Sequence, residues 1–103
     1  MVPLNDTHTV RDWMAALKIP AILVTGSYLG SISHALTAVE SLRVAKIPIA
    51  AFIVSESEGS EVPLAETLAT LSAFTPDIPL RITQPRVSSP AEAKAIHALL
   101  EKL

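Results

Sequence analysis

The sequence contains no cysteine, and this absence excludes disulfide frameworks, thiolate zinc sites and a cysteine nucleophile. Aromatic residues make up only 4% of the chain, which argues against a platform on which the bases of a nucleic acid stack. The 8 lysines and arginines are scattered and form no basic stripe. Neither nucleic acid nor an anionic membrane surface is therefore an expected partner.

Long hydrophobic runs are also missing. No apolar run approaches the roughly 18 residues that a membrane-spanning helix needs. The N-terminus has no basic start followed by a hydrophobic core and a cleavage site, so we find no secretion signal. We expect a cytoplasmic protein with no membrane partner.

What the chain does have is a high apolar content for its length. Of its 103 residues 50% are hydrophobic, the mean hydropathy is +0.44 and the formal net charge is −2. A small domain exposes a large share of its surface and usually keeps that share polar. We expect one domain at most, with its apolar surface covered by a missing part of the same fold, by a second copy or by another protein.

Three short apolar runs predict strands. Residues 21–25 form a continuous run bounded by Pro20 and Gly26, which predicts a strand buried on both faces. Residues 47–55 are apolar and rich in β-branched side chains, and they predict a second buried strand. Residues 78–83 are a weaker candidate for a third.

Helices are predicted between these runs, where apolar residues recur at helical spacing. Thr7 or Thr9 is a suitable cap for the first helix, the second extends to Lys46, Pro63 opens the third, and a Ser-Pro pair at 89–90 opens the fourth. The apolar faces of the four helices are, in chain order, Val10, Met14 and Leu17; Ile32, Leu36, Val39 and Leu42; Leu64, Leu68, Leu71 and Phe74; and Ile96, Leu99, Leu100 and Leu103.

The alternation of helices and strands indicates the fold class. It predicts right-handed crossovers and an α/β fold with a parallel sheet and flanking helices. About three strands make a small sheet, since roughly five or six is usual. The chain also begins directly in a loop, at residues 2–6. We therefore interpret residues 1–103 as a single partial α/β domain.

Chemistry is expected beyond the carboxyl ends of the strands, where ligands collect in open α/β sheets. These ends are residues 25–30, 55–59 and 84–86. The first segment combines two glycines, a serine and a helix start, which places free backbone N–H groups at the positive end of a helix dipole. This arrangement suits a carboxylate or a phosphate. The alternative is an ordinary strand-to-helix turn that needs glycine for its backbone angles.

Motifs for other chemistry are absent. A phosphate-binding loop of the GxxxxGK type requires a lysine after a glycine, and no lysine here follows one; GxSxG and HExxH are missing as well. We assign no catalytic residue and no metal ligand. His34 could act as an acid, a base or an anion donor, or it could simply pack or face solvent. The acidic residues Glu56, Glu58 and Glu61 are interpreted as a solvated loop rather than a cation site.

Four short segments together carry a resemblance to a known family. They are Val2-Pro3-Leu4, Asp12-Trp13, residues 23–26 (LVTG) and residues 29–34 (LGSISH). In this order and spacing they resemble the C-terminal half of dethiobiotin synthase. The resemblance implies a P-loop NTPase fold, a homodimer, and closure of a cyclic urea on 7,8-diaminononanoate with carbon dioxide, ATP and Mg²⁺.

The resemblance also implies what the chain lacks. The phosphate-binding loop and the magnesium-binding acid of an EGxGG segment would lie before Met1. The family is an ATP-dependent cyclo-ligase, but this chain would then be a fragment that is inactive alone.

Site residues are implied only at matched positions. Ser55 matches a residue that reads adenine, and Pro85 and Arg86 match a loop beside the same base. Many members of the family have asparagine in place of Ser55 and of Ser33, and a serine offers fewer hydrogen bonds and a shorter reach than an amide. The residues matched to the start of the helix that holds the substrate carboxylate of a neighbouring subunit are Ser27, Tyr28, Leu29, Gly30, Ser31, Ile32 and Ser33.

Two other classes of function stay open. The first is a non-catalytic α/β module that dimerises or binds a partner through the apolar surface left by absent strands. The second, a phosphocarrier or receiver-like domain, has less support. Such domains need a reactive cysteine, histidine or aspartate at a strand end, where this chain has Thr25, Ser55 and Gln84.

Overall fold

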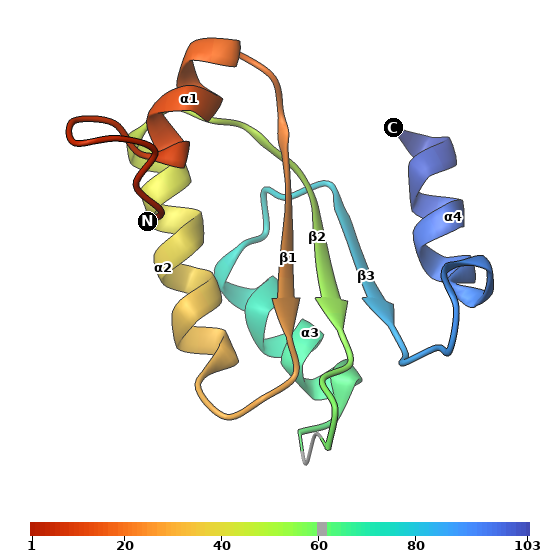
Figure 1. Ribbon diagram of the computed structural model, residues 1–103. Helices are drawn as coiled ribbons and strands as arrows, with labels where there is room; N and C mark the ends of the chain where they lie inside the picture. The colour runs from red at the N-terminus through yellow and green to blue at the C-terminus, as the bar shows by residue number, and fades with distance from the viewer. Residues whose placement is uncertain (60–61) are drawn as a thin grey trace.

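The computed structural model describes residues 1–59 and 62–103. Helices and strands alternate along the chain in the predicted order (Figure 1). The elements are α1 (Val10–Leu17), β1 (Ala21–Gly26), α2 (Ser31–Val44), β2 (Ile49–Ser55), α3 (Leu64–Phe74), β3 (Leu80–Gln84), the short 3-10 helix η1 (Pro90–Glu92) and α4 (Lys94–Lys102).

The strands form one parallel sheet in the order β1-β2-β3. Its register places Gly26 beside Ser55 and Ser55 beside Gln84, so all three strands end at the same edge. The three arrows in Figure 1 accordingly point the same way, with α2 and α4 on opposite sides of the sheet. The predicted α/β class with a parallel sheet and flanking helices is confirmed.

The core is built on both faces of β2, as predicted for this strand. Phe52 and Val54 belong to a buried cluster with side chains of α2, α3 and the turn before β3, namely Ala35, Val39, Leu71 and Ile78. On the opposite face, Ala51 and Ile53 pack with Leu99 of α4, and Leu80 and Ile82 of β3 lie against this second cluster.

The prediction that the first strand is buried on both faces is wrong. Leu23 packs toward the helices, but Ile22 is 40% exposed and Val24 is 60% exposed. Both side chains lie beside Ala51 and Ile53 in the register, yet they are not part of the Leu99 cluster. The physical reason is that β1 has β2 as its single partner among the described residues, so it is an edge strand. The side chains that cover this face lie over β2 and β3.

Several predicted helix faces and bounds also need correction. The second helix ends at Val44 rather than Lys46, because Lys46 adopts a left-handed backbone with φ 60°. The second and third strands begin two residues later than predicted, at Ile49 and Leu80, whereas the first begins at Ala21 as predicted. Four residues assigned to apolar helix faces are instead largely exposed, because the sheet does not extend beneath them: Leu17, Phe74, Leu100 and Leu103.

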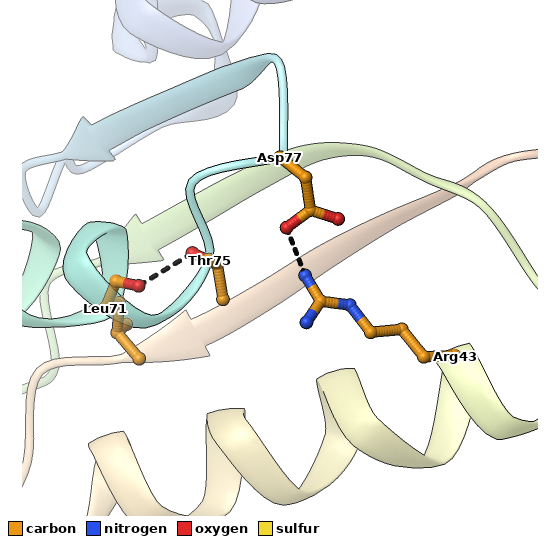
Figure 2. Close-up of polar contacts among 4 residues, drawn as sticks. All are labelled: Arg43, Leu71, Thr75 and Asp77. Atoms are coloured by element: carbon orange, nitrogen blue, oxygen red, sulfur yellow. Dashed lines mark hydrogen bonds and ion pairs between the residues drawn. The ribbon is translucent and has the colours of Figure 1, made fainter.

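The amino edge of the sheet is fixed by contacts around the α3–β3 turn (Figure 2). Arg43 in the last turn of α2 forms an ion pair with Asp77 across this turn. Both side chains are exposed, and such pairs contribute only about 0–1 kcal/mol. Buried Thr75 donates its hydroxyl to the carbonyl of Leu71 at 2.7 Å, which closes the end of α3. The buried contacts therefore hold this turn more firmly than the ion pair does.

The start of α1 depends on a capping box. Thr9, one of the two predicted caps, donates its backbone N–H to Asp12 Oδ2 at 2.7 Å, and its hydroxyl lies 3.2 Å from the same oxygen. The Thr9 backbone N–H, followed by its hydroxyl, lowers the pKa of Asp12 below its ordinary value of 3.8. Because the folded pKa is the lower one, the stabilisation is complete above the unfolded pKa and disappears as pH falls through the folded pKa.

We predict that acidification below about pH 4 loosens the first turn of α1. Trp13, the only tryptophan, follows Asp12 directly, so its fluorescence reports the change. Asp12→Asn should remove the acid transition of this signal, whereas Asp6→Asn, in the exposed N-terminal loop, should retain it. An identical transition in Asp12→Asn would show that the capping box does not control the helix start.

Candidate functional site

The loops after β1 and β2 are tied together at the carboxyl edge of the sheet. The N–H of Ser27 donates to Ser57 Oγ at 3.0 Å, and the N–H of Ser57 donates to Ser27 Oγ at 3.1 Å. Ser27 is fully buried. This reciprocal pair joins residues 30 positions apart and fixes the two loops against one another.

A second set of hydrogen bonds joins the β2 loop to the β3 loop and to α4. Glu56 donates its N–H to the carbonyl of Gln84 at 2.8 Å, and its carboxylate accepts the N–H of Arg86 at 2.9 Å. The buried Gln84 side chain donates to the carbonyl of Pro85 at 2.8 Å and accepts the N–H of Ile96 at 3.3 Å. Hydrogen bonds thus connect the segments after all three strands, which are the ends predicted to bind ligands.

A cavity of about 420 Å³ opens beside these loops. Its walls come from β1, the first half of α2 and the loop after β2. Of the predicted nucleotide-binding residues, Ser55 lines it, while Pro85 and Arg86 lie outside its lining in the next loop. The polar lining residues are Thr25, Tyr28, His34, Ser55, Glu56 and Ser57.

The predicted substrate segment does not form one surface. Ser27 and Ser31 are buried, and Ile32 packs against the core cluster. Tyr28 lines the cavity. Three residues are exposed and outside that lining, with Leu29 exposed at 94%: Leu29, Gly30 and Ser33.

The start of α2 is open to an acceptor. Gly30 is its N-cap in a left-handed conformation with φ 89°, and no side chain caps the helix. The first helical hydrogen bond runs from the N–H of His34 to the carbonyl of Gly30, which leaves the N–H groups of Ile32 and Ser33 without a partner among the described residues. The buried Ser31 hydroxyl also has none. Such a helix start fits a carboxylate.

His34 has a definite neighbour. Its Nδ1 lies 3.1 Å from the hydroxyl of Tyr28, and the centroids of the two rings are 5.9 Å apart.

Of the other two acidic residues predicted to lie in a solvated loop, Glu58 is exposed, and Glu61 lies outside the described residues. Across residues 1–59 and 62–103, no three histidine or acidic side chains are grouped to hold a metal ion. Nor does any helix in these ranges combine the length and apolar character needed to cross a bilayer.

Gly26 was predicted only as a turn residue, but the structure gives it a different role. Its φ is not among the positive values, so backbone freedom is not what it supplies. A Cβ at this position would stand 2.5 Å from Ser57 Oγ and 2.7 Å from Cδ1 of Tyr28. The lack of a Cβ at Gly26 therefore leaves the room that the side chains of Tyr28 and Ser57 occupy. Ser57, Glu56 and Gln84 were missed as structural residues of the site.

We predict that Gly26→Ala disrupts this corner, with a cost of about 1–3 kcal/mol for overpacking. Denaturant unfolding should give a lower free energy of unfolding, and the NMR signals of Tyr28 and Ser57 should be displaced. Gly59→Ala is the matched control, because Gly59 has open space around it and only its φ of 64° opposes a side chain. Unchanged Tyr28 and Ser57 signals in Gly26→Ala would contradict the assigned role.

Known proteins match the chain over most of its length. Residues 1–88 match the model of the family described as AAA domain. An ATP-dependent dethiobiotin synthetase BioD of Caulobacter sp. (strain K31) is 44% identical over 99 residues, which are 96% of this chain and 43% of that protein. The BioD of Acidiphilium cryptum (strain JF-5) is 55% identical over 71 residues, or 69% of this chain and 32% of that protein.

A third relative, from Phenylobacterium zucineum (strain HLK1), is 42% identical over 97 residues, or 93% of this chain and 41% of that protein. The chain thus spans less than half the length of these curated relatives. The resemblance predicted from the LVTG and LGSISH segments is confirmed. The chain belongs to the AAA domain family and is a relative of the ATP-dependent dethiobiotin synthetases.

Proposed function

We propose that this chain is part of a dethiobiotin synthetase, acting in the ATP-dependent closure of a cyclic urea on 7,8-diaminononanoate. The observation that carries the proposal is 44% identity to such an enzyme along 96% of the chain. The connected carboxyl edge, with a cavity and an open helix start beside it, is consistent with ligand binding there.

The chain would supply only part of the active site. It has no GxxxxGK motif to hold phosphates, and its described residues offer no group of metal ligands for Mg²⁺. In phosphoryl transfer, the phosphate loop and Mg²⁺ provide most of the positioning and charge stabilisation. The phosphates and Mg²⁺ would therefore be held by residues outside this chain, while Ser55, with Pro85 and Arg86 nearby, would face the nucleoside.

The open flank of β1 supports a partial domain. The edge of β1 away from β2 has no strand paired with it among the described residues. A groove of about 470 Å³ lies between this strand, α1 and α2, and exposed Ile22 lines it. Parallel sheets normally have both faces covered. The remaining length of a synthetase-sized polypeptide would cover this flank.

A complementation experiment tests the proposal. The chain alone should form no dethiobiotin from 7,8-diaminononanoate, carbon dioxide and Mg-ATP. Co-expression with the unmatched part of the Caulobacter sp. (strain K31) relative should restore product formation, and that part alone is the control. Turnover by the pure chain would refute the division of the site. A stable oligomer that does not respond to the added part would favour the non-catalytic module.

The start of α2 would hold the carboxylate of the substrate. Leu29, Gly30 and Ser33 are exposed and do not line the cavity. This exposure supports a homodimer in which the helix start of one subunit serves a substrate held by the other. The exposed Ser33 hydroxyl and the free N–H groups of Ile32 and Ser33 would be the donors.

We predict that Ser33→Asn strengthens carboxylate binding, because the longer amide adds a donor at the helix start. One added hydrogen bond corresponds to about a three- to tenfold lower Kd. The measurement is an NMR titration of the Ile32 and Ser33 amides with 7,8-diaminononanoate, and Ser33→Ala should bind more weakly. The carboxamide analogue of the substrate is the control. Equal shifts with both ligands would show that the helix start does not recognise the carboxylate.

A further inference from the structure

The outer side of helix α3 carries little charge for a surface that faces solvent. α2 and α3 cover the same face of the sheet, since Ala35, Val39 and Leu71 share one buried cluster with β2. The sides of both helices that point away from this cluster form the outer layer of the molecule. The exposed positions of α3 include a single charged residue: Ala65, Glu66, Ala69, Thr70, Ala73 and Phe74. Depletion of charge on an exposed apolar surface is typical of a protein interface.

A groove of about 400 Å³ lies where α2 faces the end of α3. Four residues of α2 line it, together with Phe74, the last residue of α3. Phe74 is 63% exposed, although it has the largest apolar side chain of its helix. The α2 residues of the lining are Leu36, Val39, Glu40 and Arg43. An apolar hollow and an apolar projection therefore lie next to each other on this face.

Strands added to the sheet would not cover this groove. α2 and α3 are the crossovers from β1 to β2 and from β2 to β3, so the helix layer over these strands is already present. Further strands join a sheet at its free edges, and their crossover helices lie beside the existing helices rather than on top of them. The remaining length of a synthetase-sized polypeptide therefore completes the β1 flank and leaves this face open to a separate molecule.

The shape of the groove is complementary to a second copy of itself. In a two-fold contact the same patch is used by both chains, so a projection of each chain fills a hollow of the other. Phe74 of one chain would enter the groove of the second chain and lie against the partner's Phe74. Aromatic pairs of this kind stabilise a contact beyond the area that they bury.

The charges of the groove are self-complementary as well. Glu40 and Arg43 lie one helical turn apart and carry opposite charges, so a two-fold contact sets the glutamate of each chain near the arginine of the other. Arg43 already binds Asp77 through Nη2 (Figure 2). Its guanidinium has further N–H groups, which leaves donors for a second carboxylate.

We propose that the α2–α3 face, formed by Leu36, Glu40, Arg43, Ala73 and Phe74, is the surface through which two copies of this chain dimerise. The inference rests on the homodimer of the proposed function for its choice of partner. Because α2 and α3 both start at the carboxyl edge, a two-fold axis along these helices places the carboxyl edges of both chains at one end of the dimer. Each α2 start then lies beside the carboxyl edge of the other chain, as a substrate shared between subunits requires.

Sedimentation equilibrium of the complete chain, without substrate or nucleotide, tests the surface. The wild-type chain should form a dimer, and Phe74→Ala should raise its dissociation constant about thirtyfold or more, as for a central interface residue. Leu100→Ala is the matched control, because Leu100 is 58% exposed but lies on α4, across the sheet. Val24→Lys, on the open β1 strand, should also leave the constant unchanged.

A charge exchange tests the pairing across the axis. Glu40→Arg and Arg43→Glu should each weaken the dimer, because like charges then meet. An equimolar mixture of the two variants should restore a dimer that contains one chain of each kind. Glu101→Arg, an exposed charge reversal on α4, controls for the change in net charge. Thermal unfolding of every variant checks that it is folded.

The outcomes separate this surface from the proposed function. A monomeric wild-type chain, an unchanged dimer in Phe74→Ala, or a dimer lost in Val24→Lys would each overturn the surface. A mixture of the charge variants that stays monomeric would overturn the pairing. Dethiobiotin formation in the complementation experiment does not enter these measurements. A dimer that depends on Phe74 but forms no product with the added part would refute the function and retain the surface.

Discussion

The whole molecule depends on burying both faces of β2. Residues 51–54 are at most 4% exposed, so each face of this strand needs its own cover. Phe52 and Val54 are covered by α2 and α3, and Ala51 and Ile53 by Leu99 of α4. A strand covered on both faces is typical of parallel sheets, and β2 pairs in parallel with β1 and β3, which are reached by helical crossovers. The carboxyl ends of all three strands therefore meet at one edge, which is where the candidate site lies.

The sheet brings the loops together, but buried polar groups hold them there. Ser27 and Gln84 are buried and hydrogen-bonded to neighbouring loops or to α4. Leaving such a group unpaired costs about 1–3 kcal/mol, which penalises any separation of the loops. The loops that form the cavity wall are consequently held rigidly by buried hydrogen bonds. Gly26 transmits this stiffness to Tyr28, because the ring lies against a backbone whose next residue is fixed.

Hydrophobic periodicity predicts the helices and strands of this fold well, but it does not show which strand is central and which lies at the edge of the sheet. The runs that became β1 and β2 are both apolar, yet Val24 is largely exposed and Val54 is buried. The difference arises from pairing, since within the described part of the chain β1 has one neighbouring strand and β2 has two. In the same way Leu71 and Phe74 share a helical face in the sequence, but only Leu71 lies above the sheet. The burial of a side chain near the edge depends on how far the sheet extends, and a local sequence pattern does not predict that extent.

The same distinction holds for the candidate site: some of its features follow from a local sequence pattern, and others depend on contacts between distant residues. The open start of α2 is local, and its glycines and serines indicate it in the sequence. The Ser27–Ser57 and Glu56–Arg86 bonds join residues 30 apart, and an ordinary loop serine or glutamate gives no sign of them. This division has a functional consequence. The exposed residues of the helix start, Leu29 and Ser33, lie outside the cavity lining, so this part of the candidate site is open to solvent. The proposed homodimer depends on this exposure, because a second chain can reach the helix start only where it is uncovered.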